Sequence, residues 1–154
     1  MVRLPLSFFG AIFGAMVAAI ALAGTLPSPL EQLEASAPQH WVAWRVAHGF
    51  VALAVGAALI GPALPFAACG AHCLLRDLTG LLGLALLAAA VVGPRLAWSL
   101  PCLYGAAAYL TGGVSSTGPR AVWGFLTQPT GSLTADLTAG SLFVVGLLAW
   151  SKQR

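Results

Sequence analysis

The stretch LLRDLTGLLGLALLAAAVV, residues 74–92, decides the fold class of this chain. It holds only two charged side chains, Arg76 and Asp77, among residues that are nearly all leucine, alanine, glycine or valine. The apolar residues surround the segment and form neither a stripe nor an alternating pattern, which is typical of a helix in lipid. About 20 mostly apolar residues cross the roughly 30 Å of hydrocarbon in a bilayer. The stretch therefore predicts a membrane-spanning helix.

The same length criterion predicts five helices along the chain, at about 6–26, 44–66, 74–92, 96–113 and 133–150. Backbone groups in hydrocarbon must be paired within the structure, so only helices and closed barrels span a bilayer. Apolar runs of this length without period-two alternation exclude a barrel. We expect an all-α, polytopic transmembrane helical bundle that forms one domain over residues 1–154.

Two segments leave alternatives open. Segment 96–113 is short and contains Pro101, which removes a backbone donor and is expected to kink a helix. If this segment enters the bilayer only halfway, four helices cross. Ala21-Leu22-Ala23 resembles a signal-peptidase site, but the apolar run 6–26 is longer than an ordinary signal sequence, so we expect a retained helix.

The composition agrees with a membrane protein. Of the 154 residues, 59% are hydrophobic and 7% are charged, against about 25% charged residues in soluble domains. The seven cations lie singly, mostly at the ends of apolar runs, so the net charge of +3 does not predict a nucleic-acid partner. The expected partner is the lipid bilayer, and the expected location is the cell membrane, as a multi-pass protein of a bacterial inner membrane. The predicted helices place three of the cations on one side of the membrane and four on the other. Because positively charged residues usually mark the cytoplasmic side, this nearly equal count leaves the orientation open.

Turn and loop residues predict how the helices are connected. Gly93-Pro94-Arg95 separates two apolar runs so tightly that a helical hairpin is expected. The loop 114–132 carries Trp123 and Phe125, and aromatic rings favour the depth of the lipid headgroups. We expect this loop to lie flat on the membrane surface. Asp77 and Asp136 each lie near a predicted helix start, where an acidic side chain favours the exposed N–H groups.

Polar residues within the predicted spans are candidates for function. Trp41, Arg45 and His48 lie at i, i+4 and i+7 and share a helix face. One interpretation is an interfacial anchor with the Arg45 side chain reaching outward; the other is that Arg45 and His48 face the bundle and bind an anion or a carboxylate. Asp136 is either a helix-end acid or the partner of Arg45 or Arg76. If Arg45, His48 and Asp136 line a path, the protein is a self-sufficient small transporter or channel.

Cys69, His72 and Cys73 form a second candidate site. Cys69 and Cys73 are one helical turn apart, and soft ligands at this spacing are suited to zinc or copper. A fourth ligand is missing locally, and a Cys-x-x-Cys motif is absent. The alternatives are a metal or thiol-redox membrane protein, or small apolar cysteines with His72 among the headgroups.

Small residues form a third pattern. Gly10, Gly14 and Ala18 recur at a spacing of four on one helix face. In lipid, close backbone approach drives helix association, so this face predicts a helix-packing surface. The partner is either another helix of this chain or another subunit.

Catalytic motifs are missing from the sequence. Four acidic residues, two of them in the first loop, leave little for acid–base catalysis, and nucleotide, zinc-protease and serine-hydrolase motifs do not occur. We expect a protein that is not an enzyme and uses no cofactor.

Several short strings resemble a known group of proteins. These are Trp44-Arg45 with His48, the string Gly93-Pro94-Arg95-Leu96-Ala97-Trp98, and Trp123 with Gln128-Pro129. They resemble small polytopic membrane proteins of actinobacteria, some of which are similar to permease-like proteins of ABC transporters, over about residues 41–150. The resemblance implies a membrane role in transport and transfers no site residue. Together with the small-residue faces, it predicts a small non-catalytic subunit of a larger membrane complex, with other membrane subunits or further copies of itself as partners.

Overall fold

The computed structural model describes residues 6–25, 41–61, 70–111, 124–128 and 131–152. Every regular element in these ranges is helical. The elements are α1 (Leu6–Ala23), α3 (Trp41–Ile60), α4 (Gly70–Val91), the short 3-10 helix η2 (Pro94–Leu96), α5 (Ser99–Thr111), the 3-10 helix η3 (Phe125–Thr127) and α7 (Leu133–Ser151). The predicted all-α fold with about five helices is therefore confirmed.

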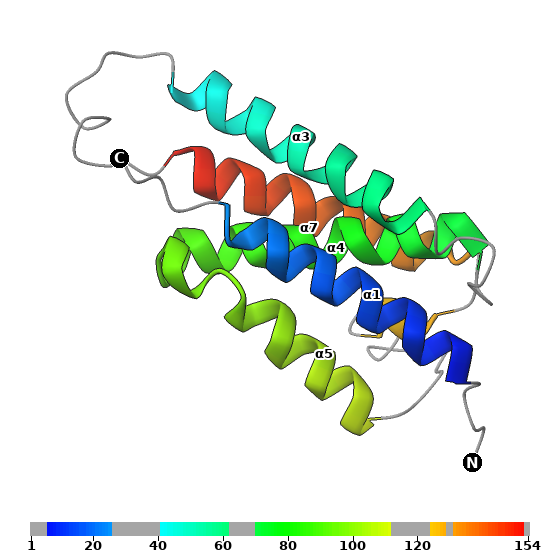
Figure 1. Ribbon diagram of the computed structural model, residues 1–154. Coiled ribbons are helices and arrows are strands. Elements are labelled where there is room, and N and C mark those ends of the chain that lie inside the picture. The colour runs from blue at the N-terminus through cyan, green and yellow to red at the C-terminus, as the bar shows by residue number, and fades with distance from the viewer. Residues whose placement is uncertain (1–5, 26–40, 62–69, 112–123, 129–130, 153–154) are drawn as a thin grey trace.

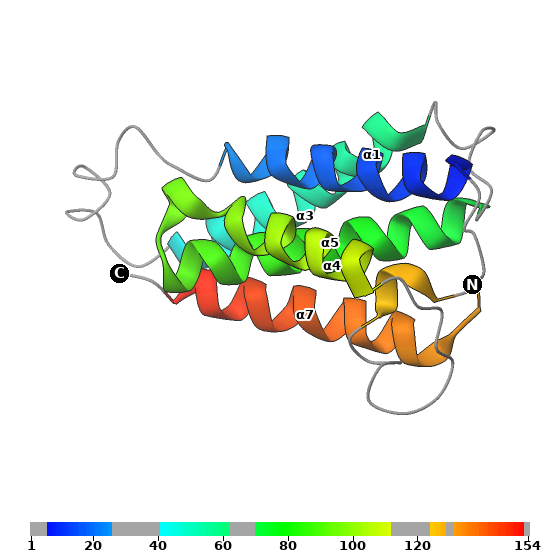
Figure 2. The ribbon, with the colours of Figure 1, turned by 90° about the horizontal axis from the view of Figure 1, so that it is seen from below.

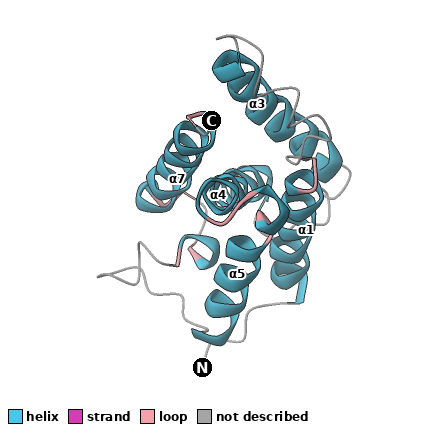
Figure 3. Ribbon diagram, turned by 90° about the vertical axis from the view of Figure 1, so that its left-hand side faces the viewer, coloured by secondary structure: helices cyan, strands magenta, loops and turns pink. Residues whose placement is uncertain are grey.

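Helix α4 lies at the centre, with α1, α3, α5 and α7 around it (Figure 3). The five helices lie roughly along one direction, and each runs opposite to the one before it (Figures 1 and 2). The bundle thus has two ends. We call the end where α1, α4 and α7 begin the Gly70 end, and the other, where α4 turns into α5, the Gly93 end.

The central position of α4 follows from its sequence. Its apolar residues occur on every side, so neighbouring helices can cover it on every side. In its apolar 18-residue stretch 67% is buried, against 33% in the corresponding stretch of α7 and 22% in that of α3. Two core clusters lie along it. One, toward the Gly93 end, includes Leu86, Ala89 and Trp150, and the other, toward the Gly70 end, includes Leu78 and Phe125.

The closest helix contact joins α4 and α7. A Cβ atom added to Gly83 would lie 2.5 Å from the Leu142 carbonyl carbon and the Phe143 nitrogen. A Cβ atom added to Gly146 would collide with the Gly83 carbonyl oxygen. Because both positions are glycine, the two backbones touch, which is how small residues promote helix association in membranes.

Three helices are long and apolar enough to cross a membrane, namely α3 over Val42–Ile60, α4 and α7. Helix α5 has 13 residues, which gives a length of about 20 Å at 1.5 Å per residue. That is shorter than the roughly 30 Å hydrocarbon layer. The described side chains of α1 give a shorter apolar stretch, Phe13–Leu22.

The expected kink at Pro101 does not occur as predicted. Pro101 lies in the first turn of α5, which begins at Ser99. The N–H groups of a first turn have no partner within the helix, so a proline there costs no hydrogen bond. The predicted hairpin is confirmed, because Gly93 adopts φ 110° and η2 leads directly into α5, which packs on α4.

Helix α4 begins about one turn earlier than predicted, at Gly70 instead of residue 74. Asp77 is therefore two turns inside the helix and fully buried, and the prediction that it caps the helix start was wrong. Asp136 does lie in the first turn of α7, as predicted for a helix-end acid.

Candidate functional site

The described part of the chain contains a buried pair of opposite charges in the central helix. The Arg76 and Asp77 side chains are 2% and 1% exposed, and Arg76 Nε donates a hydrogen bond to Asp77 Oδ1 at 3.1 Å. Arg76 Nη2 also donates to Cys73 Sγ at 3.2 Å and to the Gln128 carbonyl oxygen at 3.1 Å. A buried guanidinium needs several such acceptors, because charged groups lose their water on burial. Arg76 thus joins α4 to segment 124–128.

Segment 124–128 closes the site from the side of α5. Phe125 is fully buried, and its ring stacks on the Tyr104 ring of α5 with centroids 5.1 Å apart. The ring lies directly over Gly80, where an added Cβ would come within 2.5 Å of it. The Thr127 hydroxyl donates to the Gly124 carbonyl oxygen at 2.9 Å and so helps to hold the short turn.

The prediction that Phe125 lies on the membrane surface was therefore wrong. The physical reason is that the glycine at position 80 leaves a space the size of an aromatic ring on α4. Trp123, which was predicted to share that surface position, lies outside the described residues.

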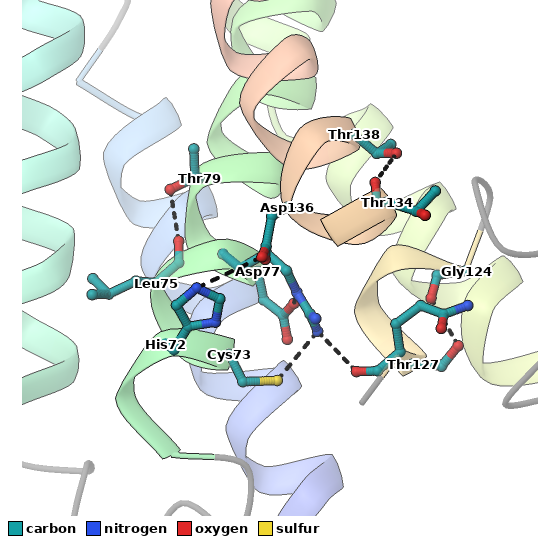
Figure 4. Close-up of polar contacts among 12 residues, drawn as sticks. His72, Cys73, Leu75, Asp77, Thr79, Gly124, Thr127, Thr134, Asp136 and Thr138 are labelled. Carbon is teal, nitrogen blue, oxygen red and sulfur yellow. Dashed lines mark hydrogen bonds and ion pairs between the residues drawn. The ribbon is translucent and has the colours of Figure 1, made fainter. Parts of the chain in front are cut away.

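The exposed side of the site is formed by His72 and Asp136. His72 Nε2 lies 3.7 Å from Asp136 Oδ2, and the two side chains are 63% and 31% exposed. Figure 4 shows His72, Cys73, Asp77 and Asp136 gathered where the first turns of α4 meet the start of α7. We refer to His72, Cys73, Arg76, Asp77 and Asp136 as the polar cluster.

Two oxygens of the polar cluster are buried without a hydrogen-bond partner among the described residues. They are Asp77 Oδ2 and Asp136 Oδ1. A buried charged acceptor without a donor is costly. The arrangement thus holds two carboxylates and one fixed guanidinium in a mostly dry region, which is suited to binding a positively charged species.

The sequence predicted some members of this cluster and missed others. Asp136 was a candidate, with Arg76 as one of its two expected partners, but no Arg76–Asp136 ion pair within 4 Å occurs among the described residues. Asp77 was missed as a site residue because the predicted helix start made it a cap. The signal was present, since an acid and a base stand side by side in an otherwise apolar span.

Arg45 and His48 lie at the Gly93 end, away from the polar cluster. Arg45 Nη1 donates to the Trp150 carbonyl oxygen at 3.1 Å, and the guanidinium lies 5.5 Å from the centroid of the Trp150 ring. His48 Nε2 lies 3.3 Å from the Thr25 hydroxyl, and its ring centroid is 5.9 Å from that of Trp150. Both residues therefore face α7 rather than pointing away from the bundle.

The structure does not bring Arg45 and His48 together with Asp136. Asp136 and Trp150 are 14 residues apart on α7, which is about 21 Å along the helix axis. The predicted set of three residues is thus divided between the two ends of the bundle.

The cysteine cluster is only partly described. Cys73 is buried and accepts the hydrogen bond from Arg76, whereas His72 is exposed and faces Asp136. Cys69 lies outside the described residues. Within the described residues, no three His, Cys, Asp or Glu side chains are grouped closely enough to hold a metal ion.

The predicted small-residue face of α1 is divided. Ala18 is buried and belongs to the core cluster at the Gly70 end, together with Ala15 and Ala19. Gly14 is exposed, and an added Cβ would meet nothing within 4 Å. Gly10 lies in α1, but its surroundings are outside the described part. The face thus serves packing within the chain at Ala18 and is open at Gly14.

Comparison with models of protein families, with curated proteins and with solved structures finds no match to this chain.

Proposed function

We propose that this protein is a small, non-catalytic integral membrane subunit of a larger membrane complex, with transport as the process that the complex serves. Three helices with the length and composition of membrane spans support a place in the bilayer. The large apolar side chains that α3 and α7 turn outward, such as Phe50, Val55 and Val144, are the surface that lipid or another membrane protein covers.

The observation that carries the subunit proposal is the outer face of α3. This helix is the least covered of the three candidate spans. Its exposed face carries four alanines at spacings of four and seven, Ala43, Ala47, Ala54 and Ala58, with the larger Val51 between the two pairs. Small residues let a neighbouring helix approach closely, and this packing is what drives helix association in lipid. The partner is therefore another membrane helix, from a different subunit or from a second copy.

Purification in a mild detergent, followed by native mass spectrometry, tests this proposal. We expect the protein to be recovered together with another membrane chain or as an oligomer. Ala54→Leu places a larger side chain on this face and should lower the recovery of the partner. Ala106→Leu makes the same change on the exposed side of α5 and serves as the matched control.

The outcomes separate the parts of the proposal. A strictly monomeric protein with no co-purifying chain would contradict the subunit role. If Ala54→Leu and Ala106→Leu lower the recovery of the partner chain equally, the result would contradict α3 as the contact surface.

A further inference from the structure

Asp77 has one carboxylate oxygen that receives no hydrogen bond from any described residue. Its Oδ1 accepts the hydrogen bond from Arg76, but Oδ2 is buried with no partner among the described residues. The neighbours one turn away on α4, Leu74 and Leu81, are buried and apolar. An ionised oxygen in such surroundings is unfavourable, because it is buried and no described residue donates a hydrogen bond to it.

The titratable groups around Asp77 that the structure describes come from three helices. Helix α4 contributes Arg76, Cys73 and His72, α7 contributes Asp136, and α5 contributes Tyr104. Segment 124–128 has no titratable side chain, and none occurs among the described side chains of α1 or along residues 49–60 of α3. Among the described residues, two carboxyl groups stand against one guanidinium, so the two carboxylates, when both are ionised beside an uncharged His72, leave one negative charge in excess.

The chemistry of the site selects the species that removes this charge. A metal cation takes several oxygen ligands, and no group of three possible metal-binding side chains occurs among the described residues. A proton needs only one oxygen. On Asp77 it neutralises the oxygen that has no donor among the described residues, and one carboxyl group, Asp136, then stands against one guanidinium, Arg76.

We infer that Asp77 is a proton-binding carboxyl group and that the polar cluster takes up one exchangeable proton. His72 and Asp136 form the exposed side of the cluster, so the proton exchanges with water at the Gly70 end. This site lies within one chain and goes beyond the proposed subunit role, because it requires no partner.

Infrared difference spectroscopy on the purified protein in lipid nanodiscs tests the inference. We expect the carbonyl band of a protonated carboxylic acid at mildly acidic pH and its loss at mildly alkaline pH. Asp77→Asn, which has the shape of the protonated side chain, should lack this band, whereas Glu34→Gln, which removes a carboxyl group that is not part of the polar cluster, should retain it. Carboxyl groups common to all variants cancel when the spectra are subtracted.

Labelling with dicyclohexylcarbodiimide, an apolar reagent that attacks protonated carboxyl groups, provides the assignment. Peptide mapping should find the adduct at Asp77 at acidic pH, in wild type and in Glu34→Gln. A carbonyl band that persists in Asp77→Asn, or one that disappears in Glu34→Gln while Asp77 remains unlabelled, would overturn the inference. Absence of any titrating carboxyl band in wild type would overturn it too. None of these results depends on whether a partner chain co-purifies.

Discussion

Arg76 and Asp77 are adjacent in the sequence and stabilise each other inside the central helix. Removing one partner of a buried ion pair costs about 3–5 kcal/mol, because the other is left uncompensated. We therefore expect Arg76→Met to lower the free energy of unfolding by about 3 kcal/mol. Denaturant titration in mixed micelles, followed by tryptophan fluorescence, measures this change.

The double variant Arg76→Met/Asp77→Leu provides the comparison. It replaces both charges with apolar side chains, so it should be more stable than Arg76→Met alone. The single variant Asp77→Leu completes the set. If the losses of unfolding free energy in Arg76→Met and Asp77→Leu add up to the loss in the double variant, the two side chains have no coupling energy, and the role of the pair in stability is refuted.

Phe125 connects a short turn to the bundle core. Truncation of a fully buried phenylalanine costs about 3–5 kcal/mol, and Phe125 is 0% exposed over Gly80. We expect Phe125→Ala to reduce the free energy of unfolding by that amount. The same substitution at Phe13, which is 62% exposed on α1, should have little effect. Equal losses at the two positions would show that burial does not decide the outcome.

The contact between α4 and α7 depends on two glycines. A methyl group at Gly83 would meet backbone atoms of α7, which cannot rotate away, so the helices must separate. Overpacking of this kind costs about 1–3 kcal/mol, and we expect Gly83→Ala to destabilise the protein accordingly. Thermal unfolding in detergent measures the loss.

Gly14→Ala is the control for this prediction. It adds the same methyl group where nothing lies within 4 Å, so the higher helix propensity of alanine should leave the protein unchanged or more stable by up to about 1 kcal/mol. A destabilisation equal to that of Gly83→Ala would argue against close packing as the cause.

The helices themselves could be predicted from the sequence, because apolar length alone defines them. The predicted ranges 74–92 and 133–150 correspond to α4 and α7, and Gly93-Pro94 marks the hairpin. Neighbours across the bundle could not be predicted in this way. Nothing near Gly80 in the sequence indicates that the Phe125 ring covers it.

The candidate site was predictable only in part, for a related reason. Asp136 was identified from its position near a helix start, whereas the role of Asp77 depended on where α4 begins. An error of one turn changed Asp77 from a cap to a buried group. Arg45 and His48 were correctly placed on one helix, but their contact with Trp150 joins segments about a hundred residues apart.

The alternation of the five helices predicts how the protein sits in a bilayer. Val92 and Leu133 are exposed at opposite ends of the bundle. In a background with Cys69→Ala and Cys102→Ala, we expect a membrane-impermeant maleimide to label either Val92→Cys or Leu133→Cys in intact cells, but not both. Permeabilised cells should show both labels. Labelling of both positions in intact cells would refute a bundle that crosses the membrane.

The position of Arg76 and Asp77 on the central helix affects how the chain is made. Asp136 follows Arg76 by 60 residues, so at about 5–20 residues per second the ribosome needs several seconds to add α7. During this interval the nascent helix carries two charges that its later neighbours do not yet shield. If the chain enters a bilayer as proposed, α4 is therefore made several seconds before the residues that cover Arg76 and Asp77 exist.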